Sequence, residues 1–288
     1  MDEFYQELIR KLSGVGINSP RLEARLICAQ ATKSEPSQLT FPLTPQQKAE
    51  ALKLLQQRLN HKPLDKILGH REFYKSDFLV DENVLSPRPD TEILVEEAIR
   101  LVEQNQPIRI LDLGTGSGCI IESILAECPN AVGVGVDISP KSLLMAQKNA
   151  EQIGVSTRLK FIQADWFDRS FVQKTAQTFD LIVSNPPYIP TGDIQGLDPE
   201  VKNYDPYIAL DGGADGLDSY RRIAELSVHL LKAGGYILLE AGIGQALDIA
   251  GIFQRQGFVL KQIVQDLSHI ERCVILQKPV AEIKKDGI

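Results

Sequence analysis

The chain has 288 residues, of which 43% are hydrophobic and 24% charged, a composition typical of a folded globular protein. Its formal net charge of −7 argues against a protein that binds along nucleic-acid phosphates, because such proteins usually carry an excess of basic residues. The four cysteines include no Cys-x-x-Cys pair and have no histidine at zinc spacing, so we expect buried thiols and no metal site.

The first residues also bear on location. Residues 1–4 lack the basic flank and apolar run of a signal peptide. No apolar stretch approaches the roughly 20 residues that a membrane-spanning helix needs. We therefore expect a cytoplasmic protein that does not cross a membrane.

Residues 1–75 are predicted to form a small helical bundle, because apolar side chains recur at helical spacing and no strand pattern interrupts them. Ser19 followed by Pro20 is typical of a helix start, with proline at the first helical position. Thr44 and Gln47 have the spacing of a capping box at the start of another helix.

Residues 76–92 are rich in Pro, Asp and Ser, and they contain one possible short strand at 78–80. We interpret this segment as a connecting hairpin or linker. Asp90 is placed to cap the next helix, which would begin a second domain spanning residues 93–288.

In the second domain, short runs rich in Val, Ile and Leu alternate with helical patterns, which predicts a doubly wound α/β fold with a parallel sheet. The predicted parallel strands are residues 108–113, 131–136, 159–164, 181–183 and 236–239. Residues 259–264 and 273–276 are separated by too short a segment for a crossover helix. They are therefore expected to form an antiparallel pair at the sheet edge.

A glycine-rich turn follows the first predicted strand. It consists of Gly114, Thr115, Gly116, Ser117 and Gly118. Such a turn lets the backbone approach a ligand closely, and Asp137 at the end of the next strand is placed to accept hydrogen bonds from ribose hydroxyls. The Gly-x-Gly-x-Gly spacing differs from the dinucleotide fingerprint, and Asp112 just ahead of the turn could face a cationic group. Together these features favour S-adenosyl-L-methionine over NAD.

Asp165 and Trp166 follow the third predicted strand, where a side chain would lie beside an adenine ring. Asp165 could accept a hydrogen bond from the exocyclic amine. Two readings of Trp166, the single tryptophan, stay open: a residue that stacks on the cofactor or a core residue.

The fourth parallel strand ends in Asn185, Pro186, Pro187 and Tyr188. Two prolines stiffen the backbone, and the Asn185 side-chain oxygen with the Pro186 carbonyl can accept both N–H bonds of a planar –NH2 group. This grip would hold a poorly nucleophilic nitrogen in line with a methyl donor, with Tyr188 flat against the planar group. The motif predicts methyl transfer to an amide or ring amino nitrogen.

The sequence resembles a known family at this point. The four-residue motif with the glycine loop looks like the amino-methyltransferases that act on adenine, cytosine or glutamine nitrogens. Three further segments, at residues 68–74, 86–92 and 209–217, resemble the peptide chain release factor N5-glutamine methyltransferases, the HemK/PrmC family. The similarity runs through almost the whole chain and is weakest in the first fifteen residues and the tail.

The resemblance implies a five-helix bundle that docks the release factor, joined to a seven-stranded, Rossmann-like class I methyltransferase domain. It implies methylation of the glutamine of the Gly-Gly-Gln loop in class-1 release factors, with S-adenosyl-L-homocysteine as product. We expect the protein to be a monomer. The implied cofactor-binding residues are Gly114, Thr115, Gly116, Ser117, Gly118, Asp137, Trp166 and Asn185. The implied catalytic residues are Asn185, Pro186 and Tyr188, and Pro187 joins them in gripping the glutamine. Tyr204-Asp205-Pro206 departs from the aromatic-Glu-Pro expected there.

Several alternatives remain open. The four-residue motif also fits a DNA or RNA amino-methyltransferase, although no basic groove or target-recognition insertion is evident, and a non-catalytic binding protein could share the fold. Arg88, Asp90 and Glu92 either shape the site or form a helix start with a surface ion pair. Glu240 at the end of the fifth strand could line the site or cap the sheet edge, and we favour the structural interpretation.

Overall fold

The computed structural model describes residues 2–102, 108–175 and 178–280. It divides into two compact units. The helical unit comprises Met1–His70 with Leu197–Asp205, and the sheet unit comprises Arg71–Gly196 with Pro206–Ile288. Some of residues 93–288, namely 103–107, 176–177 and 281–288, lie outside the described part. Within that part, no helix combines the length and apolar character needed to cross a membrane.

The helical unit is built from four helices, one 3-10 turn and a short helix from the later segment. These are α1 (Glu3–Gly14), α2 (Pro20–Thr32), η1 (Pro36–Gln38), α3 (Pro45–Leu59), α4 (Leu64–Leu68) and α9 (Pro199–Lys202). The predicted capping box is confirmed, since Thr44 and Gln47 exchange both hydrogen bonds. Pro20 opens α2 as predicted, but the Ser19 side chain makes no capping bond. Leu8, Leu12 and Ile27 are fully buried in the shared core.

Buried ion pairs tie the later segment into the helical unit. Lys66 Nζ lies 2.6 Å from Asp205 Oδ1, and the two side chains are 0% and 1% exposed. Arg58 pairs with both Glu23, at 2.6 Å, and Glu200, at 2.8 Å. The sequence pattern gave no indication that this segment, which lies within residues 93–288, packs with the helices.

The segment expected to be a connection packs against the sheet unit. It begins with β2 (Ser76–Leu79), which forms a hairpin with β1 (His70–Phe73). Because β1 lies within the residues predicted to be helical, that prediction is wrong at its carboxyl end. The rings of Phe73 and Phe78 are buried and meet edge-to-face, with their centroids 5.9 Å apart. The expected cap at Asp90 is wrong. Thr91, the last residue of η2 (Pro89–Thr91), holds the N-cap position of α5 (Glu92–Leu101), while Asp90 pairs with Arg272 at 2.8 Å.

The sheet unit contains the predicted seven-stranded sheet in the order β5-β4-β3-β6-β7-β9-β8. Its strands are β3 (Arg109–Leu113), β4 (Val132–Asp137), β5 (Leu159–Gln163), β6 (Phe179–Ser184), β7 (Leu231–Glu240), β8 (Val259–Gln265) and β9 (Glu271–Gln277). The first five are parallel, and β9 runs antiparallel to both β7 and β8, which confirms the predicted edge pair.

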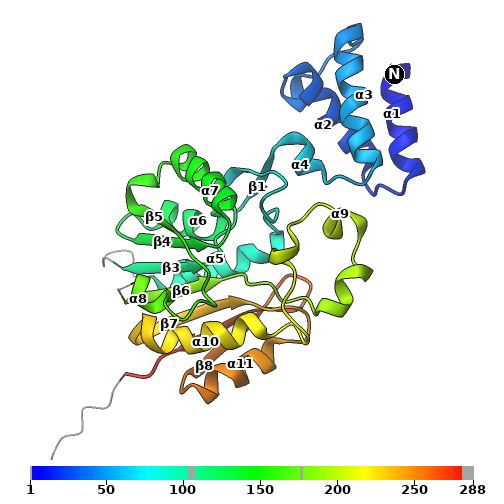
Figure 1. Ribbon diagram of the computed structural model, residues 1–288. Coiled ribbons are helices and arrows are strands. Elements are labelled where there is room, and N and C mark those ends of the chain that lie inside the picture. Colours follow the sequence, from blue (N-terminus) through cyan, green and yellow to red (C-terminus); the bar gives the residue numbers. More distant parts are fainter. Residues whose placement is uncertain (1, 103–107, 176–177, 281–288) are drawn as a thin grey trace, which may run out of the picture. The chain divides into compact units, whose positions relative to one another are not determined.

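Helices cover both faces of this sheet (Figure 1). They are α5, α6 (Cys119–Glu127) and α7 (Pro140–Ile153) on one face, and α8 (Phe171–Thr175), α10 (Asp218–Leu230) and α11 (Ala246–Arg255) on the other. Successive strand residues point to opposite faces of the sheet. Ile182 therefore packs in the core beneath α8, α10 and α11, while Leu181 and Val183 pack in the core beneath α5, α6 and α7. Polar groups are therefore left to the strand ends, where the site lies.

Candidate functional site

The glycine loop between β3 and α6 adopts a backbone that other residues rarely take. Gly114, Gly116 and Gly118 have φ angles of 78°, 56° and 86°. A Cβ atom at Gly114 would lie 2.9 Å from the ring of Trp166, so only glycine fits there without displacing the indole. The loop and the indole ring therefore form one wall in close contact.

Asp137, the last residue of β4, is held by backbone N–H groups. Its Oδ2 accepts a hydrogen bond from Gly116 at 2.9 Å, and its Oδ1 accepts one from Ser139 at 2.9 Å. Burial raises the pKa of this carboxyl, and the N–H donors of Ser139, Gly116 and Ile138 act in the opposite direction. Each carboxylate oxygen has a second lone pair, so Asp137 can still accept from a ligand.

Trp166 lies between the core and a cavity, and its stacking on a cofactor stays a prediction. The side chain lines a cavity and also packs, partly buried, against the core on the α10 side of the sheet. Its carbonyl accepts a 2.8 Å hydrogen bond from Arg222 Nε, which fixes the backbone at this point.

Asn185 directly follows β6 and is held from behind. Its Nδ2 donates to Thr91 Oγ1 at 3.3 Å, and Thr91 Oγ1 donates to Glu240 Oε2 at 2.5 Å. The neighbouring Ser184 hydroxyl donates to the Leu113 carbonyl at 2.5 Å and ties the end of β6 to β3. This arrangement occupies the nitrogen end of the Asn185 amide.

The residues after Asn185 form a tightly packed turn. The Tyr188 carbonyl accepts a 3.0 Å hydrogen bond from Gln245 Nε2, and a Cβ atom at Gly216 would come within 2.3 Å of the same oxygen. Burial raises the pKa of Tyr188 to about 12, so its phenol is neutral at physiological pH.

A cavity of about 380 Å³ opens at the carboxyl ends of the parallel strands, where ligands bind in open α/β sheets. Seven of the residues singled out from the sequence line it: Gly114, Gly116, Asp137, Asp165, Trp166, Asn185 and Pro187. The others predicted, Thr115, Ser117, Gly118, Pro186 and Tyr188, are not among its lining residues.

Three of the residues outside the lining belong to the glycine loop and hold its backbone in place. Thr115 is buried and donates to Asp112 Oδ2 at 2.7 Å. The Ser117 carbonyl accepts from Asn149 Nδ2 at 2.9 Å, and Gly118 begins α6 as its N-cap residue. Their described contacts are therefore structural.

Some lining residues were missed by the sequence reading. Asn83, Val84 and Leu85, from the expected linker, form part of the wall, and no motif marked them. Another part consists of Pro206, Ile208, Ala209, Asp211, Gly212 and Gly213. The second set overlaps the segment at 209–217 that carried the family resemblance, so a partial signal was present.

The charge of the lining is one-sided. Four aspartates line the cavity, Asp137, Asp165, Asp211 and Asp218, and none of the described lining residues is Lys, Arg or His. Hydrogen bonds from Thr191, the Gly213 N–H and Tyr207 hold the pKa of Asp211 below its usual value. An acidic cavity of this kind favours a ligand that carries positive charge.

Two carboxyls lie buried near the glycine loop. The sequence suggested that Asp112 faces a cationic ligand, but its side chain is 0% exposed and does not line the cavity. Its Oδ1 has no hydrogen-bond partner. Burial raises its pKa to about 7, against the opposing Thr115 hydrogen bond. Glu122, in the first turn of α6, is also 0% exposed, and burial raises its pKa to about 10. It is therefore protonated at neutral pH.

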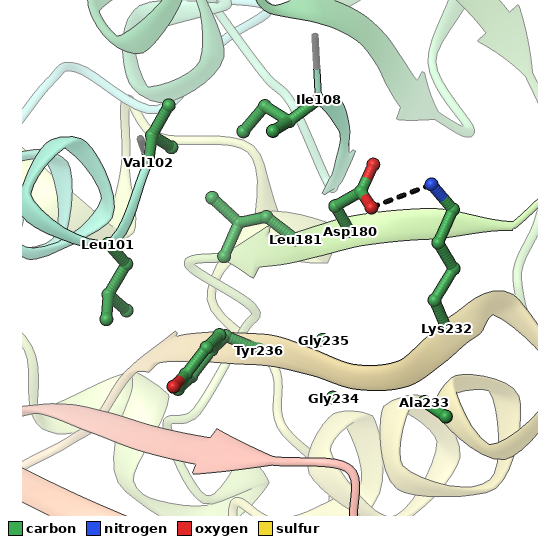
Figure 2. A pocket seen from close by; sticks show the side chains of 10 residues that line it. All are labelled: Leu101, Val102, Ile108, Asp180, Leu181, Lys232, Ala233, Gly234, Gly235 and Tyr236. Atoms are coloured by element: carbon green, nitrogen blue, oxygen red, sulfur yellow. Dashed lines mark hydrogen bonds and ion pairs between the residues drawn. The ribbon is translucent and has the colours of Figure 1, made fainter. Parts of the chain in front are cut away.

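A second cavity, of about 360 Å³, lies at the opposite ends of the strands (Figure 2). Its polar side chains are Tyr236 and the ion pair between Lys232 Nζ and Asp180 Oδ1, at 2.7 Å. Asp180 also accepts from the Arg109 N–H, so its carboxylate is already engaged. This cavity brings together none of the predicted site residues. Throughout the described chain, no group of three or more His, Cys, Asp and Glu residues is placed to hold a metal ion.

Comparison with known proteins gives consistent matches over both units. Residues 3–69 match the PrmC N-terminal domain family, and residues 104–241 match a methyltransferase domain family. A release factor glutamine methyltransferase from Rhodospirillum rubrum is 42% identical over 276 residues, which cover 94% of this chain and 83% of that protein. The proteins of the same name from Geobacter sulfurreducens and Agrobacterium fabrum are 41% and 39% identical, with coverage of 91% and 93% of this chain and 91% and 94% of theirs.

A solved structure supports the fold alone. The crystal structure of a methyltransferase from Pyrococcus furiosus superposes with a TM-score of 0.52 at 15% identity, covering 72% of this chain and 91% of that one. The seven-stranded sheet with its antiparallel edge pair is thus a class I methyltransferase fold.

Proposed function

The chain belongs to the release factor glutamine methyltransferase family, and from this premise we propose its reaction. It transfers a methyl group from S-adenosyl-L-methionine to the side-chain nitrogen (N5) of the glutamine in the Gly-Gly-Gln motif of class-1 release factors, leaving S-adenosyl-L-homocysteine. The observation that carries this proposal is the single cavity lined both by Gly114 and Asp137 and by Asn185 and Pro187.

The backbone at Gly114 and the charge of the cavity support binding of this cofactor. The left-handed Gly114 leaves room for a ligand beside the Trp166 ring, and Asp137 retains lone pairs for ribose hydroxyls. The acidic lining suits the positive sulfonium and ammonium groups of S-adenosyl-L-methionine. When bound, this cofactor supplies an electrophilic methyl group.

Asn185 and Pro186 are proposed to hold the target glutamine. Because the Asn185 nitrogen donates to Thr91, the Oδ1 atom is the end left to accept one N–H of the target amide, and the Pro186 carbonyl accepts the other. An amide nitrogen is a poor nucleophile, since its lone pair is delocalised into the carbonyl. Both hydrogen bonds strengthen as positive charge grows on that nitrogen, so they favour the transition state over the ground state. Tyr188 would flank the planar amide as a neutral ring.

The remaining assignments are part of the same proposal. The N-terminal helical domain, which the sequence predicted to span residues 1–75, would dock the release factor. The enzyme would act as a monomer in the cytoplasm, where release factors work, without binding nucleic acid directly. The alternative of a DNA or RNA amino-methyltransferase is not favoured, because the relatives reported above carry the release-factor name.

Methyl transfer from labelled S-adenosyl-L-methionine tests the proposal directly. The purified chain is given a class-1 release factor, the same factor with its Gly-Gly-Gln glutamine changed to alanine, or an RNA or DNA mixture. We expect label only on the unchanged factor. Asn185→Ala should abolish it, whereas Asn130→Ala, an exposed asparagine in the turn between α6 and β4, should not. Label on nucleic acid, or on both forms of the factor, would refute the assigned substrate atom.

A further inference from the structure

The Asn185 amide must face the cavity with its oxygen for the proposed grip to work. The two ends of a primary amide have nearly the same size but opposite hydrogen-bonding character, since one accepts and the other donates. Packing alone therefore does not choose between the two orientations. A reversed amide would set N–H groups against the N–H groups of the target and lose the contact.

Two buried side chains behind Asn185 can make this choice. Thr91 accepts from Asn185 Nδ2 at 3.3 Å and donates to Glu240 Oε2 at 2.5 Å. Thr91 and Glu240 are each 2% exposed, so water does not compete for these bonds. Residues from three separate elements, η2, the end of β6 and the end of β7, thus form one chain of hydrogen bonds.

The direction of this chain follows from the chemistry of its members. An ionised carboxylate only accepts, so it requires the single hydroxyl hydrogen of Thr91 to point toward Glu240. The hydroxyl lone pairs are then left for Asn185, whose nitrogen end must face Thr91. If Glu240 is protonated it can donate to Thr91, which frees the hydroxyl hydrogen for an oxygen of Asn185. Both amide orientations then become satisfactory.

We propose that Thr91 and Glu240 are positioning residues whose hydrogen-bond chain keeps the Asn185 oxygen turned toward the target amide. This inference rests on the proposed function for its catalytic consequence, but it concerns the orientation of a side chain that can be observed without any substrate. It also revises the structural interpretation of Glu240 made from the sequence.

The surroundings of Glu240 bring the pKa of its carboxyl close to neutral pH. Burial raises its pKa to about 7, while the hydrogen bonds from Thr91 and Asn185 and the charge of Arg272 act against burial. The titratable or charged groups that interact with it are Arg272 and Cys273 of β9, Asp90 of η2, Tyr188 after β6, Tyr220 of α10 and Cys119 of α6. Arg272 is itself shared between Asp90 at 2.8 Å and Asp266 at 3.2 Å, so it only partly offsets the burial.

The first test is the pH profile of single-turnover methyl transfer to the release factor. The wild-type rate should rise with pH through about 7, because the ionised carboxylate fixes the amide. Glu240→Gln should remove this step and lower the rate by about tenfold to a hundredfold, by analogy with the loss of a partner that orients a metal ligand. Thr91→Val should lower the rate similarly, whereas Thr91→Ser, which keeps the hydroxyl, should restore it.

Controls separate positioning from general damage. Cofactor binding, followed by Trp166 fluorescence, should change less than about twofold in all three variants, a change worth under about 0.4 kcal/mol. Glu97→Gln removes another buried glutamate, on α5, and should leave the pH step in place. A step that persists in Glu240→Gln belongs to another group, such as Asp112, and would overturn the proposal.

The second test does not depend on activity. The side-chain N–H resonances of Asn185, identified by their loss in Asn185→Ala, should shift with a midpoint near pH 7 in the wild type. They should lose this shift in Glu240→Gln, show a smaller shift in Thr91→Val, where only the direct hydrogen bond of Asn185 to Glu240 remains, and keep it in Thr91→Ser. If these resonances do not shift with pH in the wild type, the proposed role of the hydrogen-bond chain is refuted even if methylation occurs. If the resonances shift as expected but the release factor is not methylated, the proposed function is refuted, whereas the role of the hydrogen-bond chain in orienting Asn185 is supported.

Discussion

Replacement of Glu122 by glutamine should make the sheet unit less sensitive to alkaline pH. Both side-chain oxygens of Glu122 are buried without a hydrogen-bond partner, and burial with the charge of Asp112 raises its pKa from 4.5 to about 10. Its place in the first turn of α6 favours a negative charge by at most about 2 kcal/mol, which is too little to offset burial. The folded chain therefore keeps a proton that the unfolded chain releases.

The sign and size of the effect follow from that proton. Because the folded state binds it more tightly, rising pH favours unfolding by about 1.4 kcal/mol per pH unit between the two pKa values. The other strongly raised carboxyls, Asp112 and Glu240, have folded pKa values of about 7, so their contribution is largely complete above that pH. Between about pH 7 and pH 8.5 the wild type should thus lose about 2 kcal/mol that Glu122→Gln retains.

Urea unfolding followed by tryptophan fluorescence measures this difference. Trp166 is the single tryptophan and belongs to the sheet unit, so its signal reports the unit that contains Glu122. The change of unfolding free energy with pH is compared, rather than its absolute value, because the buried amide of glutamine alters the latter. Glu151→Gln, an exposed carboxylate on α7, should behave as the wild type. Equal slopes for wild type and Glu122→Gln would refute a protonated, buried Glu122.

Two further substitutions test the wall of the cavity and the tether of the helical unit. Gly114→Ala should weaken cofactor binding measured by calorimetry, because its Cβ would lie 2.9 Å from the Trp166 ring. Gly154 has a similar φ angle but open space around it, so Gly154→Ala should only lower the stability of the fold, by about 1–2 kcal/mol, through backbone strain. Lys66→Met should destabilise the helical unit by about 3–5 kcal/mol, because it removes the cation that pairs with the buried Asp205 carboxylate. Hydrogen exchange of the α1–α4 amides should record this loss, and adding Asp205→Leu should restore most of the protection; unchanged exchange in Lys66→Met would contradict the role of the ion pair.

The sequence was sufficient for most of the helices and strands and for part of the cavity. Hydrophobic periodicity predicted the parallel strands, the antiparallel edge pair and the N-terminal helices, because each depends on residues close together in the chain. Gly114, Asp137 and Asn185 could be grouped before the structure was known, since each follows a parallel strand and such strand ends share one edge of a sheet. The predicted capping box at Thr44 is local in the same sense.

What only the tertiary structure decided depends on pairs that are distant in sequence. Thr91 and Glu240 are 149 residues apart, Asn185 and Thr91 are 94 apart, and Lys66 and Asp205 are 139 apart. No local pattern specifies such pairs, because a buried polar side chain takes whichever partner the packing of other elements brings to it. The same reason explains Asp90, which had the sequence of a helix cap but pairs with Arg272 from the last strand.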